Sequence, residues 1–312
     1  MMLGLAEEVS MSSITEQHIV DWQEQGFAII EGFLSPEEFL PVRKEYEGIY
    51  GLPGASRQEV LSLKKEGSIG EFRSEQFKNI DELPYAGSAE LNMLSLHPKL
   101  IEFAKQLLGV EDVHLYQSHT WAKFTGEADY DQTFHCDYGN HTLTIPSEDR
   151  RLRSVDFILY LTDVTDAHGA LHYVTKPDAD GVLRQGAVSA TEAQQQQLLG
   201  VQRSAAGPAG TLVAHSIDTF HRGTNLTEPN GHRFTMTVGY KAAGNDMIGY
   251  QVWQQQADRP WSIIFANASP AQLACLGIPL PGNPYWTERT LKLSQARWPD
   301  WDMSEYFSAG LA

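Results

Sequence analysis

Cysteine is nearly absent from this sequence of 312 residues, which contains only Cys136 and Cys275. Two cysteines so far apart cannot form a disulfide framework or a thiolate cluster, so any bound metal must be held by nitrogen and oxygen atoms. Basic residues are also scarce, with 23 Lys and Arg against 40 Asp and Glu and a formal net charge of −17. This excess of negative charge disfavours nucleic acid and anionic membrane surfaces as partners.

Long hydrophobic runs are missing as well. No apolar segment approaches the length that spans a bilayer, and the first residues lack a basic region followed by an apolar core, so we expect a soluble, cytoplasmic protein. The composition, 42% hydrophobic and 20% charged, is that of a globular protein. Because there is no internal repeat and no clear linker, we expect a single domain over residues 1–312. The sequence does not predict its oligomeric state.

The expected elements fall into three regions. Helix signals dominate residues 14–110, where Thr15 and Ser35 stand in N-cap positions. Over residues 112–245, short alternating segments separated by Gly, Asp, Asn and Pro predict antiparallel strands, since the long crossover helices that parallel strands require are missing. We expect these strands to form a barrel or sandwich with the helices on one side. Residues 246–312 are rich in Trp and Pro and are expected to be an irregular cap with a short capped helix at SPAQLACLG.

The segment QTFHCDYGNHTL (132–143) sets a histidine and an aspartate two positions apart. Side chains alternate along a strand, so His135 and Asp137 would share one face. A third candidate ligand, His221, follows 84 residues (221 − 137) after Asp137, behind another strand and turn. Two histidines and one carboxylate on one face of a metal leave positions open for other ligands, as in non-haem Fe(II) oxygenases. The ligand set alone does not exclude zinc or copper.

Arg233 follows His221 by twelve residues (233 − 221), beyond the turn signal EPNG. The order H-x-D, distant His, then Arg resembles that of the Fe(II)/2-oxoglutarate dioxygenases, specifically the phytanoyl-CoA dioxygenase family, which includes ectoine hydroxylases. Three further segments are similar to the family's N-terminal opening, the strand before its iron motif and its central strand pair. They are DWQEQGFAIIEGFLSPEEF, YQSHTWAKF and FILYLTDVTDAHGALHYV.

The resemblance implies a double-stranded β-helix, the jelly-roll or cupin-like barrel. Such a protein would use Fe(II), 2-oxoglutarate and O2 to hydroxylate a small metabolite or natural-product intermediate, releasing succinate and CO2. It implies iron ligands at His135, Asp137 and His221, and Arg233 as the partner of the distal carboxylate of 2-oxoglutarate. By the same resemblance, four polar residues would lie near the co-substrate: Gln117, Lys123, Thr133 and Thr224. The carboxylate of Asp137 favours hydroxylation over halogenation, whereas desaturation, ring formation and epimerisation stay open.

Two residues are candidates for contact with substrate. His141 would line the substrate pocket or lie in a surface loop, and Arg153 would touch substrate or form an ion pair at a strand end. Other histidines in alternating strands are interpreted as satisfied, partly buried groups. These are His119, His172 and His215.

The role of Arg233 depends on geometry. If His221 and Arg233 lie on paired strands, an odd number of loop residues, such as three with Gly231 left-handed, places both on one face. We predict the odd loop; otherwise Arg222 becomes the candidate. A non-catalytic metal- or ligand-binding barrel and a zinc-dependent hydrolase are the alternatives. In a non-catalytic barrel, an unpaired buried arginine would carry a large desolvation cost. For a zinc-dependent hydrolase, no general base is evident near the triad.

Overall fold

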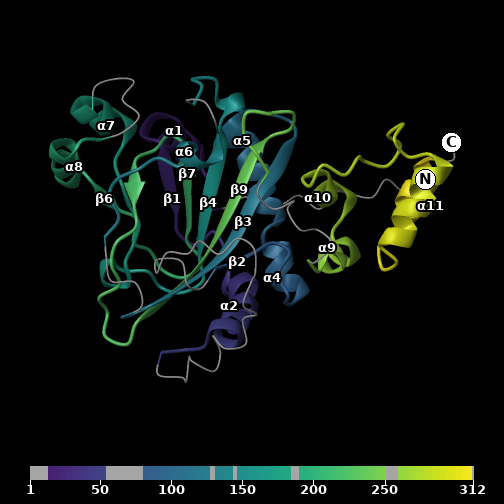
Figure 1. The fold of residues 1–312 in the computed structure, drawn as a ribbon, viewed down its shortest axis with the longest axis horizontal. Coiled ribbons are helices and arrows are strands. Elements are labelled where there is room, and N and C mark those ends of the chain that lie inside the picture. Colours follow the sequence, from purple (N-terminus) through teal and green to yellow (C-terminus); the bar gives the residue numbers. More distant parts are fainter. Residues whose placement is uncertain are drawn as a thin grey trace.

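Two antiparallel β-sheets form the centre of the protein (Figure 1). This computed structural model describes residues 13–53, 80–126, 131–142, 146–183, 190–250 and 259–310. The main sheet has six strands in the order β1-β7-β4-β9-β3-β2. They are β1 (Phe27–Ile30), β2 (Ile80–Glu82), β3 (Val113–Phe124), β4 (Ser154–Tyr160), β7 (Leu212–Ser216) and β9 (His232–Ala242). The minor sheet, in the order β6-β5-β8, consists of β5 (His172–Tyr173), β6 (Arg203–Ser204) and β8 (His221–Arg222).

Helices from the N-terminal region cover one face of the main sheet (Figure 1). They are α1 (Glu16–Gln25), α2 (Pro36–Tyr50), α4 (Ala89–Leu94) and α5 (Pro98–Leu108). The local signals in the sequence are confirmed here: α2 begins with a capping box, in which the Ser35 main-chain N–H donates to Glu38. Gly26 ends α1 in the left-handed region at φ 93°, a conformation that glycine adopts readily.

Alternating side chains divide the main sheet into two faces, with one irregularity in β3 between Leu115 and Gln117. Phe157 of β4 and Val238 of β9 belong to the main core, where Phe103 of α5 stacks on Phe157 at 5.7 Å between ring centroids. Their sequence neighbours, Asp156 and Gly239, therefore face the other way, into the space between the two sheets. The jelly-roll architecture predicted from the sequence is confirmed, and polar side chains are concentrated on this inner face.

The described C-terminal region contains several helices, of which the sequence predicted the short one at SPAQLACLG, now confirmed as α10 with Ser269 as its N-cap. They are α9 (Trp261–Asn267), α10 (Pro270–Ala274), α11 (Glu288–Arg297) and α12 (Ser304–Gly310). An aromatic cluster joins them, with Phe265 stacked on Trp298 at 4.6 Å. The described part of this region packs beside α4, on the helix-covered side of the main sheet (Figure 1). Residues 259–310 consequently do not cap the space between the sheets.

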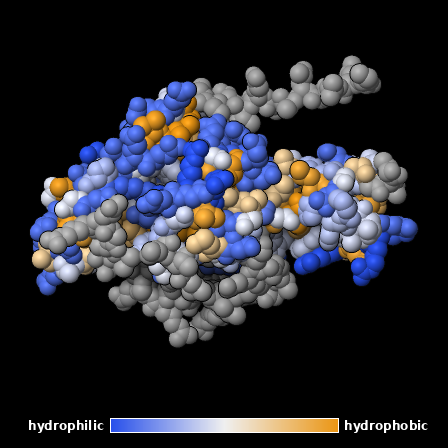
Figure 2. Space-filling model, turned by 90° about the horizontal axis from the view of Figure 1, so that it is seen from above, coloured by the Kyte–Doolittle hydropathy of each residue, from blue (hydrophilic) through white to orange (hydrophobic). Residues whose placement is uncertain are grey.

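The other helices of the described residues lie in the connections between strands. They are α6 (Tyr138–His141), α7 (Lys176–Leu183), α8 (Glu192–Leu199) and the 3-10 turns η2 (Arg150–Leu152) and η3 (Asp166–His168). In the described ranges, no helix combines the length and the apolar character that crossing a bilayer requires. The face shown in Figure 2 is mainly hydrophilic, with hydrophobic residues gathered in small areas.

Candidate active site

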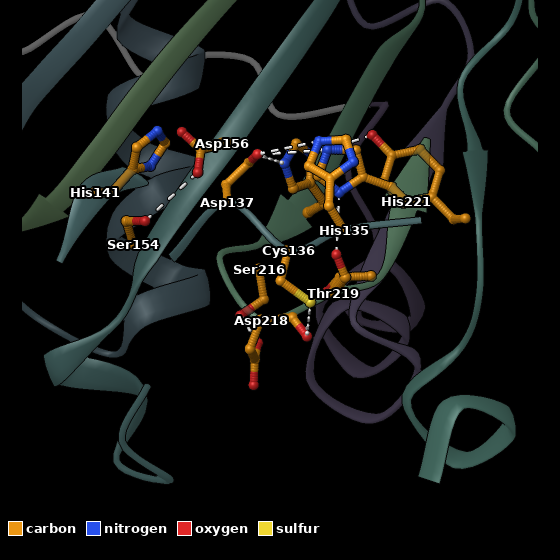
Figure 3. A network of polar contacts seen from close by, with 12 residues as sticks. His135, Cys136, Asp137, His141, Ser154, Asp156, Ser216, Asp218, Thr219 and His221 are labelled. Carbon is orange, nitrogen blue, oxygen red and sulfur yellow. Dashed lines mark hydrogen bonds and ion pairs between the residues drawn. The ribbon is translucent and has the colours of Figure 1, made fainter. Parts of the chain in front are cut away.

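The three predicted ligands meet between the two sheets (Figure 3). A bridge of two 3.0 Å backbone hydrogen bonds joins His135 to His221 at the start of β8. Nε2 of His135 lies 3.8 Å from Oδ1 of Asp137, and Nε2 of His221 lies 3.6 Å from Oδ2 of the same carboxylate. One ligand atom from each residue lies within 4.8 Å of the others. Residues 84 positions apart (221 − 137) thus form one cluster that could hold a metal ion.

Main-chain carbonyls orient both histidines of this cluster. The Nδ1–H group of His135 donates to the carbonyl of Thr133, and that of His221 to the carbonyl of Thr219, each at 3.0 Å. With Nδ1 protonated, Nε2 of each neutral ring keeps its lone pair and is available to a metal. Thr133 therefore acts on the site through its main chain, whereas the sequence analysis placed its hydroxyl near the co-substrate.

The charge states of the cluster suit metal binding. Burial lowers the pKa of His221 to about 4, so its imidazole is neutral at pH 7. Burial alone would raise the pKa of Asp137, but attraction by His221 and the hydrogen bond from His215 outweigh it and hold that pKa well below its usual range. Metals bind neutral imidazole and ionised carboxylate, so these residues fit Fe(II).

A polar row crosses the inner face of the main sheet beneath the cluster. Strand register places His215 opposite Asp156, Asp156 opposite Gly239, and Gly239 opposite Gln117. Asp156 is fully buried and accepts hydrogen bonds from the Tyr116 hydroxyl, at 2.6 Å, and from the Gln117 amide. The sequence analysis placed Gln117 near the co-substrate, but its amide is bound to Asp156. It did not identify His215 or Tyr116 as parts of the site.

Gly239 is required by this row, because a side chain there would collide with its polar groups. A Cβ atom at Gly239 would lie 2.6 Å from Oδ1 of Asp156 and equally close to Gln117 and Tyr116. We expect Gly239→Ala to destabilise the protein by about 1–3 kcal/mol, as overpacking does, and urea unfolding would measure this. Gly249→Ala, where a Cβ meets nothing within 4 Å, is the control. Equal stability of the two variants would contradict the packing of the row.

Two cationic side chains converge at the other end of the inner face. Lys123 of β3 and Arg233 of β9 are directly opposite in the register. Arg233 donates to the Gly169 carbonyl, and Lys123 donates to the Thr224 carbonyl at 2.9 Å. These acceptors are adjacent, since a Cβ at Gly169 would lie 2.6 Å from the Thr224 oxygen. Within the described residues, no carboxylate lies within the 4.0 Å ion-pair distance of Arg233.

The structure corrects the reasoning that led to Arg233. Strands β8 and β9 are not paired: β8 pairs with β5, and β9 pairs with β3 and β4, so the parity of the intervening loop does not set the face. Asn230, at φ 53°, is left-handed there instead of Gly231. Arg233 nevertheless shares the inner face, because it is six residues from Gly239. Arg222 instead pairs with Asp131 at 3.4 Å.

Of the three remaining predicted site residues, some lie on the inner face of the main sheet and some do not. His141 lies on the inner side, where its Nδ1 is 3.0 Å from the Tyr116 hydroxyl. Arg153 forms an ion pair with Asp218 at 3.3 Å, which is the second of its two predicted roles. The Thr224 hydroxyl donates to the Ala170 carbonyl at 2.7 Å. His141 is therefore the better placed of the two substrate candidates.

The jelly roll and its His-Asp-His cluster define the class of 2-oxoglutarate-dependent non-haem iron oxygenases, whose cofactor is Fe(II) and whose co-substrates are 2-oxoglutarate and O2. The sequence profile of the family described as phytanoyl-CoA dioxygenase (PhyH) matches residues 22–230. This match covers well over half of the chain, so the protein belongs to that family. A search of curated proteins found no match.

Solved structures share the fold at low sequence identity. EctD from S. alaskensis, with 2-oxoglutarate and 5-hydroxyectoine, is 18% identical with a TM-score of 0.57, covering 82% of this chain and 85% of that one. The α-ketoglutarate-dependent epimerase SnoN from nogalamycin biosynthesis is 17% identical with a TM-score of 0.53, covering 73% and 82%. The carbocyclase SnoK from the same biosynthesis is 20% identical with a TM-score of 0.52, covering 74% and 85%.

Proposed function

We propose that the protein hydroxylates a small-molecule metabolite or natural-product intermediate, coupled to conversion of 2-oxoglutarate into succinate and CO2. The observation that carries this proposal is the combination of the His135, Asp137 and His221 cluster with the half-buried cation of Arg233 on the same inner face. A purely structural metal site has no need of Arg233. Its side chain is half-buried, and its Nε atom is buried without a hydrogen-bond partner in the described residues, which is costly for a cation. An anionic co-substrate removes that cost.

Arg233 and Lys123 together are suited to hold the distal carboxylate of 2-oxoglutarate. Like charges directly opposite each other on neighbouring strands repel, and an anion between their ends converts that repulsion into attraction. The planar guanidinium of Arg233 can bind a carboxylate through two parallel hydrogen bonds. This contact fixes the co-substrate in one orientation relative to the three metal ligands. Holding reactants in a productive geometry lowers the barrier of the reaction.

The bound metal would supply activation of O2, and the chain would supply ligands and binding surfaces. His135, Asp137 and His221 would ligate Fe(II), leaving positions for the co-substrate. His141 and Tyr116, which lie on the same inner side, are the residues we assign to the substrate. We further propose that residues 1–312 form a single catalytic domain, with residues 14–110 supporting the main sheet.

Replacing Arg233 by glutamine tests this function. Hydrogen bonds to charged groups contribute about 1.5–3 kcal/mol, so Arg233→Gln is expected to raise the 2-oxoglutarate concentration needed for half-maximal succinate formation about 10–100-fold. Succinate release at a series of 2-oxoglutarate concentrations measures the change. Fe(II) affinity should stay unchanged, because Arg233 does not contact the three ligands.

Arg222→Gln is the matched control, because Arg222 pairs with Asp131 and lies outside the inner face. This variant should require the same 2-oxoglutarate concentration as the wild type. If Arg233→Gln also behaved like the wild type, the assignment of Arg233 would be wrong. If the wild type bound Fe(II) but formed no succinate from 2-oxoglutarate, a non-catalytic metal-binding barrel would be the better account.

A further inference from the structure

A third histidine, His215 of β7, contacts the ligand cluster through Asp137. Its side chain is 3% exposed, and its Nε2 atom lies 3.1 Å from Oδ2 of Asp137. On the other side of the ring, Nδ1 lies 3.1 Å from the hydroxyl of Tyr173 in the minor sheet. The ring of His215 also packs on that of His221, with 4.8 Å between centroids. His215 therefore connects both sheets to the carboxylate of the cluster.

The hydrogen-bond partners give His215 the opposite tautomer from the ligands. His135 and His221 each donate Nδ1–H to a main-chain carbonyl, which can only accept, and so leave Nε2 as the bare nitrogen. The partner of His215 Nδ1 is a hydroxyl, which can donate. A Tyr173 O–H bond to Nδ1 places the proton of the neutral ring on Nε2. Nε2–H then donates to Asp137.

The surroundings of Tyr173 keep this donor in place. Tyr173 is fully buried and stacks on Phe27 of β1, with 4.8 Å between ring centroids. Burial raises the pKa of Tyr173, so its hydroxyl stays protonated and able to donate. His215 is held in turn by its place in the main sheet, between Phe27 and Asp156 in the register. The geometry of this chain of contacts is thus fixed from both sheets.

We propose that His215 is a positioning residue, which donates Nε2–H to Oδ2 of Asp137 and leaves Oδ1 of that carboxylate for the metal. The inference rests on the proposed metal site. The hydrogen bond to Oδ2 opposes rotation of the carboxylate and favours metal binding through Oδ1 alone, which leaves the positions that 2-oxoglutarate needs open. Partners of this kind around metal ligands change metal affinity about 10–100-fold when they are lost.

Metal titration of two His215 variants tests the proposal without relying on catalysis. In His215→Gln, the amide nitrogen reaches nearly the same place as Nε2 and still donates; in His215→Phe, the ring remains but the donor is lost. We expect Co(II), followed by its visible absorption, to bind His215→Phe about 10–100-fold more weakly than the wild type. His215→Gln should bind within about threefold of the wild type and give the same spectrum.

Two further variants control the experiment. Tyr173→Phe removes the hydroxyl that sets the tautomer and should also weaken Co(II) binding. If the His215→Phe protein fails to fold, this variant still tests the proposal. His172→Gln changes a histidine of the minor sheet that pairs with Asp166, away from the cluster, and should leave Co(II) binding unchanged.

Three results would overturn the proposal. Wild-type affinity in both His215→Phe and Tyr173→Phe would show that the donor has no role in positioning Asp137. Equal loss in the Gln and Phe variants, with an altered Co(II) spectrum, would make His215 a ligand in the alternative set with Asp137 and Asp156, whose ligand atoms also lie within 4.8 Å of one another. A wild type that binds no Co(II) would remove the proposed metal site itself, a failure distinct from the other two.

Discussion

Replacing Asp137 by alanine is expected to abolish metal-dependent activity. Asp137 is the only carboxylate of the His135, Asp137 and His221 cluster and the only one of the three with a negative charge to offset that of Fe(II). Loss of an outer hydrogen-bond partner typically costs 10–100-fold in metal affinity, so loss of this ligand should cost more than about 100-fold. Fe(II) titration under anaerobic conditions measures the affinity, and succinate release should fall to background.

The loss in Asp137→Ala must be separated from unfolding. Removing the carboxylate leaves the His215 donor without its acceptor, which costs about 1–3 kcal/mol, so thermal melting of the metal-free variant should be recorded alongside. Asp149→Ala is the control, because Asp149 pairs with Arg151 on the surface and should not affect the metal. Wild-type Fe(II) affinity in Asp137→Ala would assign the metal to other residues.

Replacing Asp218 by asparagine is expected to destabilise the fold strongly. Asp218, three residues before His221 in the sequence (221 − 218), forms ion pairs with Lys176 at 2.9 Å and with Arg153 at 3.3 Å, and all three side chains are largely buried. Asparagine would leave two cations close together without their counter-charge. Breaking a buried ion pair costs about 3–5 kcal/mol, and the partial exposure of this cluster places the expected loss near about 3 kcal/mol.

The effect should extend to the site, because the Asp218 main chain contacts the ligand segment. Its carbonyl accepts a hydrogen bond from the Cys136 thiol at 3.4 Å, and the next residue, Thr219, orients His221. Urea unfolding measures the stability. Lys176→Met introduced into Asp218→Asn should restore part of it, since one of the two repelling cations is removed.

The same cluster predicts a pH dependence. Burial alone would raise the pKa of Asp218, but Lys176 and Arg153 outweigh it and lower that pKa below the ordinary value of an aspartate. A carboxyl whose pKa is depressed on folding stabilises the protein above its unfolded-state pKa and loses that contribution as the pH falls through the folded value. Wild-type stability should therefore fall below about pH 3.8. Asp218→Asn should lack this component, and identical acid profiles would contradict the assignment.

The proximity of His135 and Asp137 could be predicted because its signal is local, whereas the role of His221, 84 residues further on (221 − 137), came from the resemblance to a known family. The expected strand does not form, since the segment is joined to β8 by a single bridge and Asp137 has helical dihedral angles, but His135 and Asp137 do lie at the same site. The caps of α1 and α2 held for the same reason, because each depends on residues within one turn.

The roles of other residues depend on contacts between distant segments, and these could not be predicted. His215 could not be distinguished from His119 and His172 in similar strands, because its partner Asp137 is 78 residues away and its other partner lies in the second sheet. Arg233 lies on the inner face although the hairpin invoked to place it does not exist. The pairing of β8 with β5 is long-range, and no turn residue indicates it.

An anaerobic titration of the metal-free protein with Fe(II) and then 2-oxoglutarate tests the central claim most directly. We predict a weak visible charge-transfer band that appears only when both are present, and that is absent from Asp137→Ala. In Arg233→Gln the band should require about 10–100-fold more 2-oxoglutarate. Binding of Fe(II) at His135, Asp137 and His221 without any band on addition of 2-oxoglutarate would contradict the account.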